Sequence, residues 1–216
     1  MKSFIEKYKH AWVLLYVFIY FPWFVYLEKT VTKNYALIQI GLDEKIPFIE
    51  HFIIPYLFWF AFMAITVVYF FFKDRTEFYR LFAFLCIGMT LFLIISTIWP
   101  NGQALRPTVF ARDNIFVDLV RNLYRTDTPT NVFPSIHVYN TLGCYIAIRQ
   151  SRHLRQIRGI QIASLVVTIL IILSTVFLKQ HSFVDALGAG VIAGVAYLLA
   201  YKIEFKKRHA LTRIPT

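Results

Sequence analysis

Six long apolar segments run through this chain of 216 residues. Five of them carry no charged residue over 17 to 21 positions, and the sixth contains only Asp185. A helix needs about 20 apolar residues to cross the hydrocarbon core of a bilayer, so each segment has the length of a membrane span. In lipid, only helices and closed barrels satisfy their backbone hydrogen bonds. The predicted spans are about 11–28, 52–72, 81–99, 132–148, 159–178 and 182–201.

We therefore expect one all-α, polytopic membrane domain over residues 1–216. With 58% hydrophobic and 18% aromatic residues, the composition excludes an ordinary water-soluble globular protein. The stretches between the spans offer no separate soluble domain. The fourth span is the most polar, because it contains Ser135, His137, Asn140 and Thr141.

The distribution of Lys and Arg predicts the orientation of these spans. Fifteen of the 23 basic residues, against four acidic ones, lie near the two termini and in the segments 73–80 and 149–158. The alternate loops hold eight residues of each sign, so the net charge of +11 lies on one side. By the positive-inside rule that side is cytoplasmic, which predicts a multi-pass cell-membrane protein with both termini in the cytoplasm. This orientation explains the basic pI without a nucleic-acid partner.

Two loops on the predicted outer side, 28–51 and 100–131, are longer than the others. The second contains an amphipathic segment at about 114–125, which Asp113 is placed to cap. Its apolar stripe consists of Phe116, Leu119, Val120, Leu123 and Tyr124. Such a helix lies in the membrane interface, where it either roofs a site or only closes the loop.

Three polar clusters stand at the outer ends of the spans, and the first is Arg106-Pro107 after the third span. A guanidinium fork suits the oxygens of a phosphate group. An Arg near the interface also commonly anchors its helix by extending its charge toward water. Arg106 is therefore a candidate phosphate ligand only in combination with other residues.

The second cluster, Phe-Pro-Ser-Ile-His at 133–137, opens the fourth span. Proline is preorganised for the first helical position, so the amides of Ser135, Ile136 and His137 are expected to face outward at the positive end of the helix dipole. The residue before the proline has no side-chain acceptor to cap them, which makes this turn a candidate phosphate cradle. The alternative is capping by water or by Asn131, with His137 hydrogen-bonded inside the bundle.

The third cluster, 179–185, opens the sixth span and contains His181 and Asp185. Residues four apart lie on the same face of a helix, so Asp185 can accept a hydrogen bond from one ring nitrogen of His181. That contact fixes the tautomer and leaves the other nitrogen as a nucleophile. An ionisable side chain inside an otherwise uncharged span is costly and is usually functional.

The sixth span also contains small residues at a helical spacing. Gly190 and Gly194 lie four apart, and Ala186 extends the row by one turn. Such rows let two membrane helices approach each other closely. We therefore expect this face of the span to pack against a neighbouring helix.

The order Arg-Pro, Pro-Ser-x-His and His-x-x-x-Asp, each at the end or start of a span, resembles the type 2 phosphatidic acid phosphatase superfamily. The resemblance covers the chain from the third span onward and implies that family's haloperoxidase-like helical bundle. In that family a histidine attacks phosphorus, an aspartate orients it and a second histidine protonates the leaving oxygen. The resemblance thus implies His181 as nucleophile, Asp185 as its partner and His137 as general acid, without a metal or other cofactor.

The same resemblance implies which residues bind the phosphoryl group. Arg106, Ser135 and the backbone at Ile136 would stabilise the charge that develops on it. Two cationic positions of the family's full pattern are not cationic in this chain. Lys179 and Arg112 are candidates to replace them, and Lys179 is only two residues from the predicted nucleophile.

The chain departs from the family's fullest pattern at three positions. The lysine of the first motif is Trp99, the glycine of Pro-Ser-Gly-His is Ile136, and the arginine six residues before the nucleophile is Thr175. In this respect the chain looks like the branch that includes inositol phosphorylceramide synthases. Enzymes of that branch pass a phosphorylated head group to a lipid alcohol.

The leading interpretation is a membrane lipid phosphatase that acts on a lipid phosphate or diphosphate at the extracytoplasmic face. The same residues would serve a lipid phosphotransferase, but a compact chain without an extra acceptor-binding domain favours hydrolysis. A non-catalytic membrane protein is the third interpretation, motivated by the two missing cations. Such a protein would have no evident reason to keep Asp185 inside a membrane helix.

Overall fold

The computed structural model describes residues 6 and 8–203. Its helical elements are η1 (Lys9–Tyr16), α2 (Val17–Thr30), α3 (Gly41–Lys45), η2 (Glu50–Phe52), α4 (Ile53–Lys73), α5 (Arg75–Ile98), α6 (Ile115–Thr126), α7 (Ile136–Gln150), α8 (Arg158–Phe177), α9 (Phe183–Tyr197) and η3 (Leu198–Ile203). Two short strands are β1 (Ala36–Leu37) and β2 (Asn101–Gly102). The structure is 73% helical, which confirms the predicted helical class.

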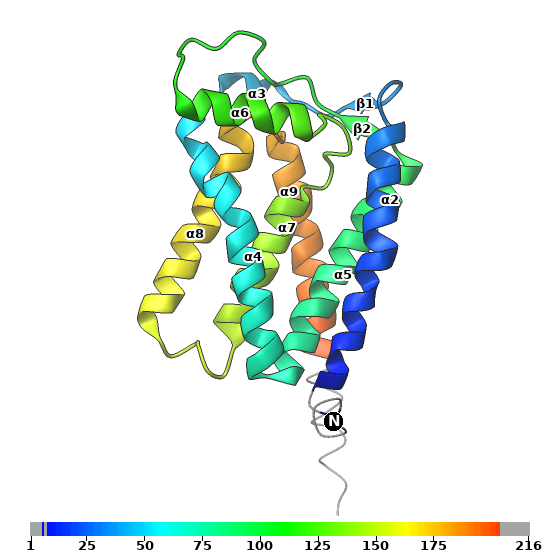
Figure 1. Cartoon of the computed structure of the whole chain (residues 1–216), viewed down its shortest axis with the longest axis vertical. Coiled ribbons are helices and arrows are strands. Elements are labelled where there is room, and N and C mark those ends of the chain that lie inside the picture. The colour runs from blue at the N-terminus through cyan, green and yellow to red at the C-terminus, as the bar shows by residue number, and fades with distance from the viewer. Residues whose placement is uncertain (1–5, 7, 204–216) are drawn as a thin grey trace, which may run out of the picture.

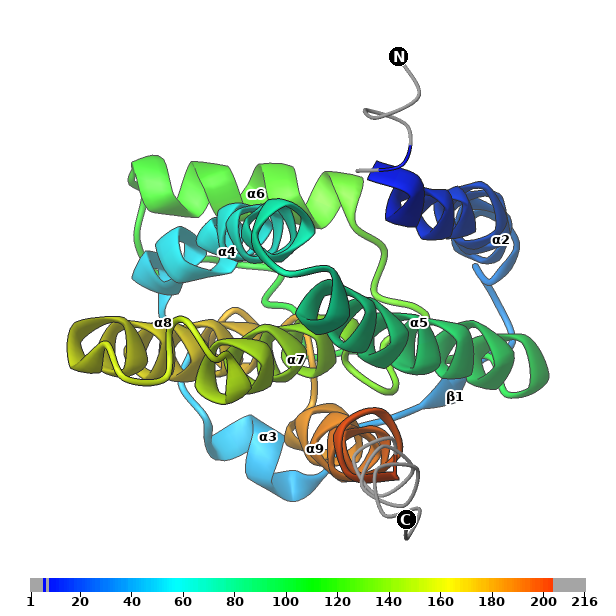
Figure 2. The same ribbon diagram turned by 90° about the horizontal axis from the view of Figure 1, so that it is seen from below.

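The long helices stand side by side in one bundle (Figure 1). Seen along the bundle, α5, α7 and α8 form a central row, with α4 on one side and α9 on the other (Figure 2). Helix α7 packs against all four of these helices, and α2 packs against α5 at the edge. Helices α3 and α6 and both strands lie at one end, called here the α6 end. The α4–α5 turn and the α7–α8 loop lie at the opposite end.

Five helices are long and apolar enough to cross a membrane among the residues that the structure describes: Lys9–Thr30, Glu50–Lys73, Arg75–Ile98, Arg158–Phe177 and Phe183–Lys202. The predicted fourth span is not among these five. The helix at its place, α7, has only 15 residues and a length of about 22 Å at 1.5 Å per residue. Its polar residues Asn140 and Thr141 are buried between neighbouring helices. That α7 crosses the membrane, giving six spans in total, therefore stays a prediction.

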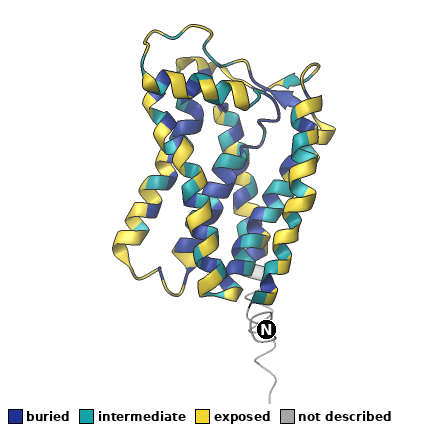
Figure 3. Ribbon diagram, viewed as in Figure 1, coloured by how far each residue is buried: buried dark blue, intermediate teal, exposed yellow. Residues whose placement is uncertain are grey.

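The outer surface of the bundle is apolar. Figure 3 shows exposed residues on the outward faces of the helices and buried residues between them. Many exposed residues are large and hydrophobic, among them Phe18, Ile65, Phe72, Leu187 and Val191. A contiguous surface of this kind marks contact with another apolar phase. Together with the five long helices, it is consistent with a multi-pass membrane protein.

The third predicted span begins earlier than expected. Helix α5 starts at Arg75, six residues before the predicted boundary at 81. Asp74 is responsible, because its carboxylate accepts hydrogen bonds from the amides two and three residues later at 2.8 and 2.9 Å. A capping aspartate satisfies the first free amides of a helix. The segment 75–80, with its charged residues Arg75, Glu77 and Arg80, therefore forms the first turns of α5 and not a loop.

A pair of parallel strands, absent from the all-α prediction, joins the two long loops at the α6 end. Strand β1 pairs with β2, with Ala36 opposite Asn101. Asn101 is fully buried, and its side-chain oxygen accepts hydrogen bonds from the amides of Val132 and Phe133, each at 2.9 Å. These contacts fix the segment that leads into α7.

Helix α6 forms where an interfacial helix is predicted, at about 114–125, and lies across the end of the bundle (Figure 1). Its fully buried Val120 packs with residues from the ends of α4 and α8. The predicted cap is wrong by one residue, because Asn114 accepts the hydrogen bonds of the first amides at 3.0 Å. Asp113 instead forms an ion pair with Arg121 at 2.9 Å.

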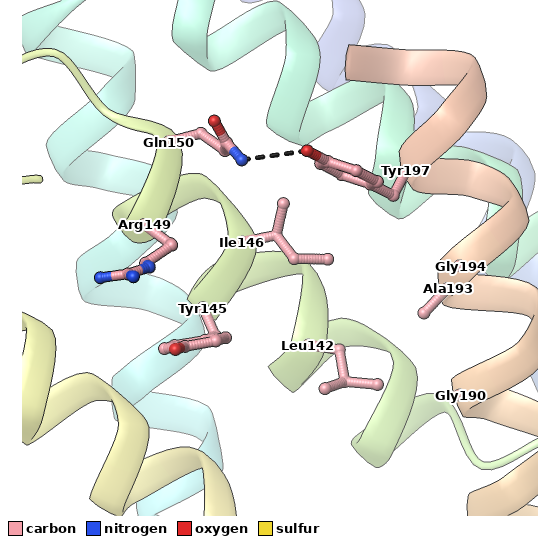
Figure 4. Close-up of a pocket in the computed structure, with 9 residues that line it drawn as sticks. All are labelled: Leu142, Tyr145, Ile146, Arg149, Gln150, Gly190, Ala193, Gly194 and Tyr197. Atoms are coloured by element: carbon pink, nitrogen blue, oxygen red, sulfur yellow. Dashed lines mark hydrogen bonds between the residues drawn. The ribbon is translucent and has the colours of Figure 1, made fainter. Parts of the chain in front are cut away.

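The closest helix packing occurs at a different glycine from the predicted pair. At Gly88 in α5, an added Cβ would lie 2.0 Å from the ring of Tyr139 in α7. Beside Gly190 and Gly194, an added Cβ would meet nothing within 4 Å. Both glycines line an apolar groove of about 300 Å³ between α7 and α9 (Figure 4). The glycine pair therefore opens a groove, contrary to the predicted close helix contact.

The substitution Gly88→Ala is expected to destabilise the protein. The added methyl would displace the Tyr139 ring, whose hydroxyl donates a hydrogen bond to the carbonyl of Phe84 at 2.7 Å. Overpacking of this kind costs about 1–3 kcal/mol. Thermal unfolding in detergent measures the effect. Gly190→Ala is the matched control and should melt no lower than the unmodified protein, so equal melting of the two variants would contradict the close contact of α5 and α7.

Candidate active site

The first turn of α7 and the turn between α8 and α9 meet at a small cavity. His137 and His181 both line it, and their ring centroids are 5.8 Å apart. The cavity volume is about 50 Å³. This is several times the roughly 10–15 Å³ that one water molecule needs. The other described lining residues are Phe24, Glu28, Phe92, Asp127, Thr128, Thr130, Asn131, Val132, Ile136 and Gln180.

The backbone at His181 is held by the C-terminal end of α8. Lys179 adopts a left-handed conformation with a φ of 52°, which reverses the chain direction after the helix. The carbonyl of Thr175 accepts hydrogen bonds from the amides of Gln180 and His181, both at 3.0 Å. Ser182 then caps α9. His181 is therefore fixed between two helix ends, and only 7% of the residue is exposed.

Asp185 lies next to His181 as predicted, although His181 precedes the N-cap Ser182 and the two residues do not share one helix. Its Oδ2 atom is 3.4 Å from Nδ1 of His181 and accepts a hydrogen bond from the Ser182 amide at 2.8 Å. The 3.4 Å separation is long for a hydrogen bond, and catalytic contacts of this kind commonly tighten when substrate binds. Since Nδ1 faces the carboxylate, Nε2 lies on the opposite edge of the ring.

Helix α7 begins differently from the prediction. Ser135 is its N-cap and accepts a hydrogen bond from the amide three residues later at 3.3 Å, so Pro134 lies outside the helix. The amide of Ser135 donates to the backbone carbonyl of Asp185 at 3.2 Å and is not free. The amides of Ile136 and His137 come first in the helix and have no acceptor within it. Two of the three predicted amides therefore lack an acceptor within the helix, and both belong to residues that line the cavity.

Aromatic rings enclose His137. Its ring centroid lies 4.7 Å from that of Tyr56 and 4.4 Å from that of Trp59, both in α4. Its Nδ1 atom is buried and has no hydrogen-bond partner within the described part of the chain. The ring of His137 is therefore positioned by packing, whereas that of His181 is positioned by its backbone and a carboxylate.

Arg106 connects the loop after α6 with the His181 turn. Its guanidinium donates to the carbonyls of Asp127 and Thr128 at 2.7 and 3.1 Å. It also donates to the side-chain oxygen of Gln180 at 2.5 Å and lies 4.6 Å from the ring centroid of Tyr124. Burial lowers the pKa of Arg106, and the Asp127 charge opposes this effect. Arg106 does not line the cavity itself, but it contacts Gln180, which does.

The ammonium group of Lys179, which the sequence predicts at the phosphate site, is bound elsewhere. Its Nζ atom donates to the carbonyls of Asp43 and Ile46, both at 2.5 Å. Burial lowers the pKa of Lys179, and the Asp43 charge opposes this effect. The structure therefore places this charge on the segment around α3 and not among the residues that line the cavity.

Asp43, which sequence reasoning missed, holds the His181 turn from the α3 side. Its carboxylate accepts hydrogen bonds from the hydroxyl of Ser182 at 2.6 Å and from the amide of Phe183 at 2.8 Å. The same carboxylate caps α3 through the amide of Ile40 at 2.8 Å. Asp43 is only 2% exposed. Helix α3 is therefore clamped to the turn that carries His181.

Arg112, the second predicted replacement cation, also has a partner away from the cavity. Its Nη1 atom is 3.0 Å from Oε1 of the buried Glu50. The side-chain amide of Asn114 donates to the same oxygen at 3.2 Å. These contacts tie the start of α6 to the start of α4, and Arg112 does not line the cavity.

The structure brings two acidic residues to the cavity that the sequence did not single out. Glu28 accepts hydrogen bonds from the Thr128 hydroxyl at 2.6 Å and from the Asn131 side-chain amide at 2.9 Å. Asp127 accepts one from the side-chain amide of Gln180 at 3.1 Å. Burial raises the pKa of the Asp127 carboxyl, and a neighbouring guanidinium charge opposes this effect. Their only sequence signal was a position near the outer end of a predicted helix.

A bundle of membrane helices with two histidines and a buried aspartate at one end has the components of a phosphoryl-transfer site. The model of the PAP2 superfamily matches residues 35–199, a range that contains all three motifs. The chain therefore belongs to the PAP2 superfamily, which generally contains phosphatases and phosphotransferases. No curated protein and no solved structure matches the chain. The family predicted from the motifs is confirmed.

The substitution Asp43→Ala is expected to lower the thermal stability. It leaves the Ser182 hydroxyl and the Phe183 amide without their buried acceptor. An unsatisfied buried donor costs about 1–3 kcal/mol. Thermal unfolding in detergent gives the change, with Glu44→Ala, an exposed neighbour in α3, as the control. If Asp43→Ala unfolded at the same temperature as Glu44→Ala, the clamp would contribute nothing to stability.

Proposed function

We propose that this chain is a six-span lipid phosphatase that hydrolyses a lipid phosphate or diphosphate through a phosphohistidine intermediate on His181. One observation carries the proposal: His137 and His181, from separate segments, line one cavity with ring centroids 5.8 Å apart, while Asp185 lies behind His181. Membership of the PAP2 superfamily supports a membrane phosphatase-type enzyme.

In the first proposed step, Nε2 of His181 attacks phosphorus, and the bond between phosphorus and the leaving oxygen breaks. Asp185 stabilises the positive charge that develops on the imidazole ring of His181. His137 donates a proton to the leaving oxygen, so that the lipid departs as an alcohol or, from a diphosphate, as a monophosphate. The products of this step are phosphohistidine and a neutral His137.

Water completes the proposed reaction. As the water oxygen attacks phosphorus, the neutral His137 accepts one of its protons. The bond between phosphorus and Nε2 of His181 breaks, and inorganic phosphate is released. Both histidines then have the protonation states in which the cycle began, so no external acid or base is consumed.

The first turn of α7 supports charge stabilisation on the phosphoryl oxygens. The amides of Ile136 and His137, which have no acceptor within α7, belong to residues that line the cavity, and the helix dipole adds positive potential there. Arg106 holds Gln180 at the cavity wall. The observed partners of Lys179 and Arg112 favour positioning roles for these two residues over direct phosphate contact.

A lipid phosphotransferase is the second candidate. It is favoured by the Phe-Pro-Ser-x-His form of the second motif and by the departures at Trp99, Ile136 and Thr175. Its first step would be the same, but a lipid alcohol would replace water in the second. The product of the second step therefore distinguishes the two reactions.

We also propose that the site faces the extracytoplasmic side of the cell membrane. The segments 73–80 and 149–158, which carry much of the basic excess, lie at the end of the bundle opposite the α6 end (Figure 1). The positive-inside rule places that basic end in the cytoplasm. His137 and His181 then open toward the outer leaflet.

Replacing either histidine by alanine is expected to lower phosphate release by about 100- to 10,000-fold. The measurement uses purified protein in detergent, a chelator in the buffer and a panel of phosphatidic acid, phosphatidylglycerol phosphate and polyprenyl diphosphate. His153→Ala, in the exposed loop at the other end of the bundle, is the matched histidine control and should keep full activity.

The same experiment separates the three interpretations. Labelled phosphate should appear on the unmodified protein in an acid-labile form and be absent from His181→Ala. New phospholipid without free phosphate would replace the phosphatase proposal with the phosphotransferase. Equal behaviour of the unmodified protein and His181→Ala, with alcohol acceptors also present, would favour a non-catalytic protein.

The orientation predicts which loops an impermeant maleimide can label in intact cells. Lys33→Cys at the α6 end should react, whereas Arg155→Cys at the opposite end should react only after the membrane is permeabilised; both positions are exposed. The native Cys86 and Cys144 are replaced by alanine in both variants. The reverse labelling pattern would place the site on the cytoplasmic side.

A further inference from the structure

Two acidic side chains lie at the cavity beside the histidines. Glu28 and Asp127 line it, and none of its described lining residues is a Lys or an Arg. The guanidinium of Arg106 is bound to backbone carbonyls and to Gln180. A phosphate dianion entering this cavity alone would be repelled by the two carboxylates. The two carboxylates therefore favour a substrate that also carries a positive group.

The acidic side chains are held in place but retain hydrogen-bonding capacity. Glu28 accepts one side-chain donor at each oxygen, and every carboxylate oxygen has two lone pairs. Asp127 accepts from Gln180 and Tyr56 through Oδ2, which leaves Oδ1 without a partner among the described residues. Asn131 adds an acceptor, because it is 6% exposed and its Oδ1 atom is also unpartnered there. The cavity thus offers acceptors to a ligand with several N–H or O–H donors.

Two aromatic rings make up another part of the wall. Phe24, one turn before Glu28 in α2, and Phe92 in α5 line the cavity, with ring centroids 6.2 Å apart. The face of an aromatic ring attracts a cation within about 6 Å. A neutral polyol would use the acceptors but would gain little from the rings. Carboxylates and aromatic rings together favour an ammonium group.

We propose that Glu28, Asp127 and the rings of Phe24 and Phe92 bind an ammonium group that the substrate carries near its phosphoryl group. This inference rests on the proposed function, which places the phosphoryl group at His181. The substrate class is then a zwitterionic phosphate ester of an amino alcohol. Its ammonium is attracted to both carboxylates, while its phosphoryl oxygens lie at the first turn of α7.

This subsite makes the two carboxylates specificity-determining residues. A phosphate ester without an ammonium group brings a third anionic group next to the two carboxylates, which weakens its binding. The ammonium can belong to the lipid alcohol of a monoester or to the head group of a diester. Both sources present the same chemistry to Glu28 and Asp127.

Binding of soluble ligands tests the subsite separately from turnover. Phosphoethanolamine and its N-acetyl derivative, which lacks the positive charge, are titrated calorimetrically into the His181→Ala protein in detergent. We expect the amine to bind at least about tenfold more tightly, a difference of about 1.4 kcal/mol. Equal affinity for the two ligands, or no binding of the amine at millimolar concentration, would overturn the inference.

Variants that remove one negative charge test which residues cause the preference for the amine. Glu28→Gln and Asp127→Asn, each in the His181→Ala background, should lose most of the preference for the amine without weaker binding of the N-acetyl ligand. Asp118→Asn, an exposed carboxylate of α6, is the matched control and should keep the preference. Melting temperatures identify any variant that has not folded, and retention of the full preference in both folded cavity variants would refute the assignment.

Turnover then identifies the source of the ammonium. The unmodified protein is supplied with a long-chain amino-alcohol phosphate, its N-acetyl derivative or phosphatidylethanolamine. Phosphate release from the first substrate places the ammonium on the lipid alcohol, whereas diacylglycerol release from the third places it on the head group. If the amine binds more tightly than its N-acetyl derivative but turnover does not depend on His181, only the proposed function is refuted. If N-acetylation leaves turnover unchanged, only the subsite is refuted.

Discussion

The carboxylate of Asp185 is fully buried at the start of a membrane helix, and the elements that carry the histidines are connected through this residue. Its side chain accepts a hydrogen bond from the Ser182 amide and lies 3.4 Å from His181, while its backbone carbonyl accepts the Ser135 amide. A buried charge is costly unless polar groups contact it, and the Ser182 amide and the His181 ring are the groups next to this carboxylate. The separate backbone contact with Ser135 joins the starts of α7 and α9, so His137 and His181 lie close together.

The loops at the α6 end then hold this arrangement in place. Asn101 fixes the segment before α7, and Asp43 clamps α3 to the turn that carries His181. Arg106 connects the segment after α6 to Gln180 on the same turn. These polar contacts are all made where the helices end, because apolar side chains occupy most of the surface along the helices. The bundle supplies rigidity, and the loops supply the positions of the reactive groups.

Local spacing in the sequence predicted the apolar helices and a helix at the position of α6. The cap of α6 was predicted one residue early, because Asp113 and Asn114 can both cap a helix. The start of α5 was predicted six residues late, because the charged segment 75–80 resembles a loop. The fourth span was predicted to begin four residues too early, because Ser135 caps α7 and the residues before it are not helical. The family was predictable because its three motifs are short and follow a fixed order.

The sequence by itself determined the helical class and the family, and it singled out His137, His181 and Asp185 as candidate site residues. Hydrophobic length and short motifs are properties of single segments, so these features do not depend on distant contacts. Only the tertiary structure decided which charges surround the cavity. Glu28 and Asp127 reach it, whereas Lys179 and Arg112 bind Asp43, Ile46 and Glu50 instead. Those partners lie far away in the chain, and only the packing of the loops at the helix ends brings them together.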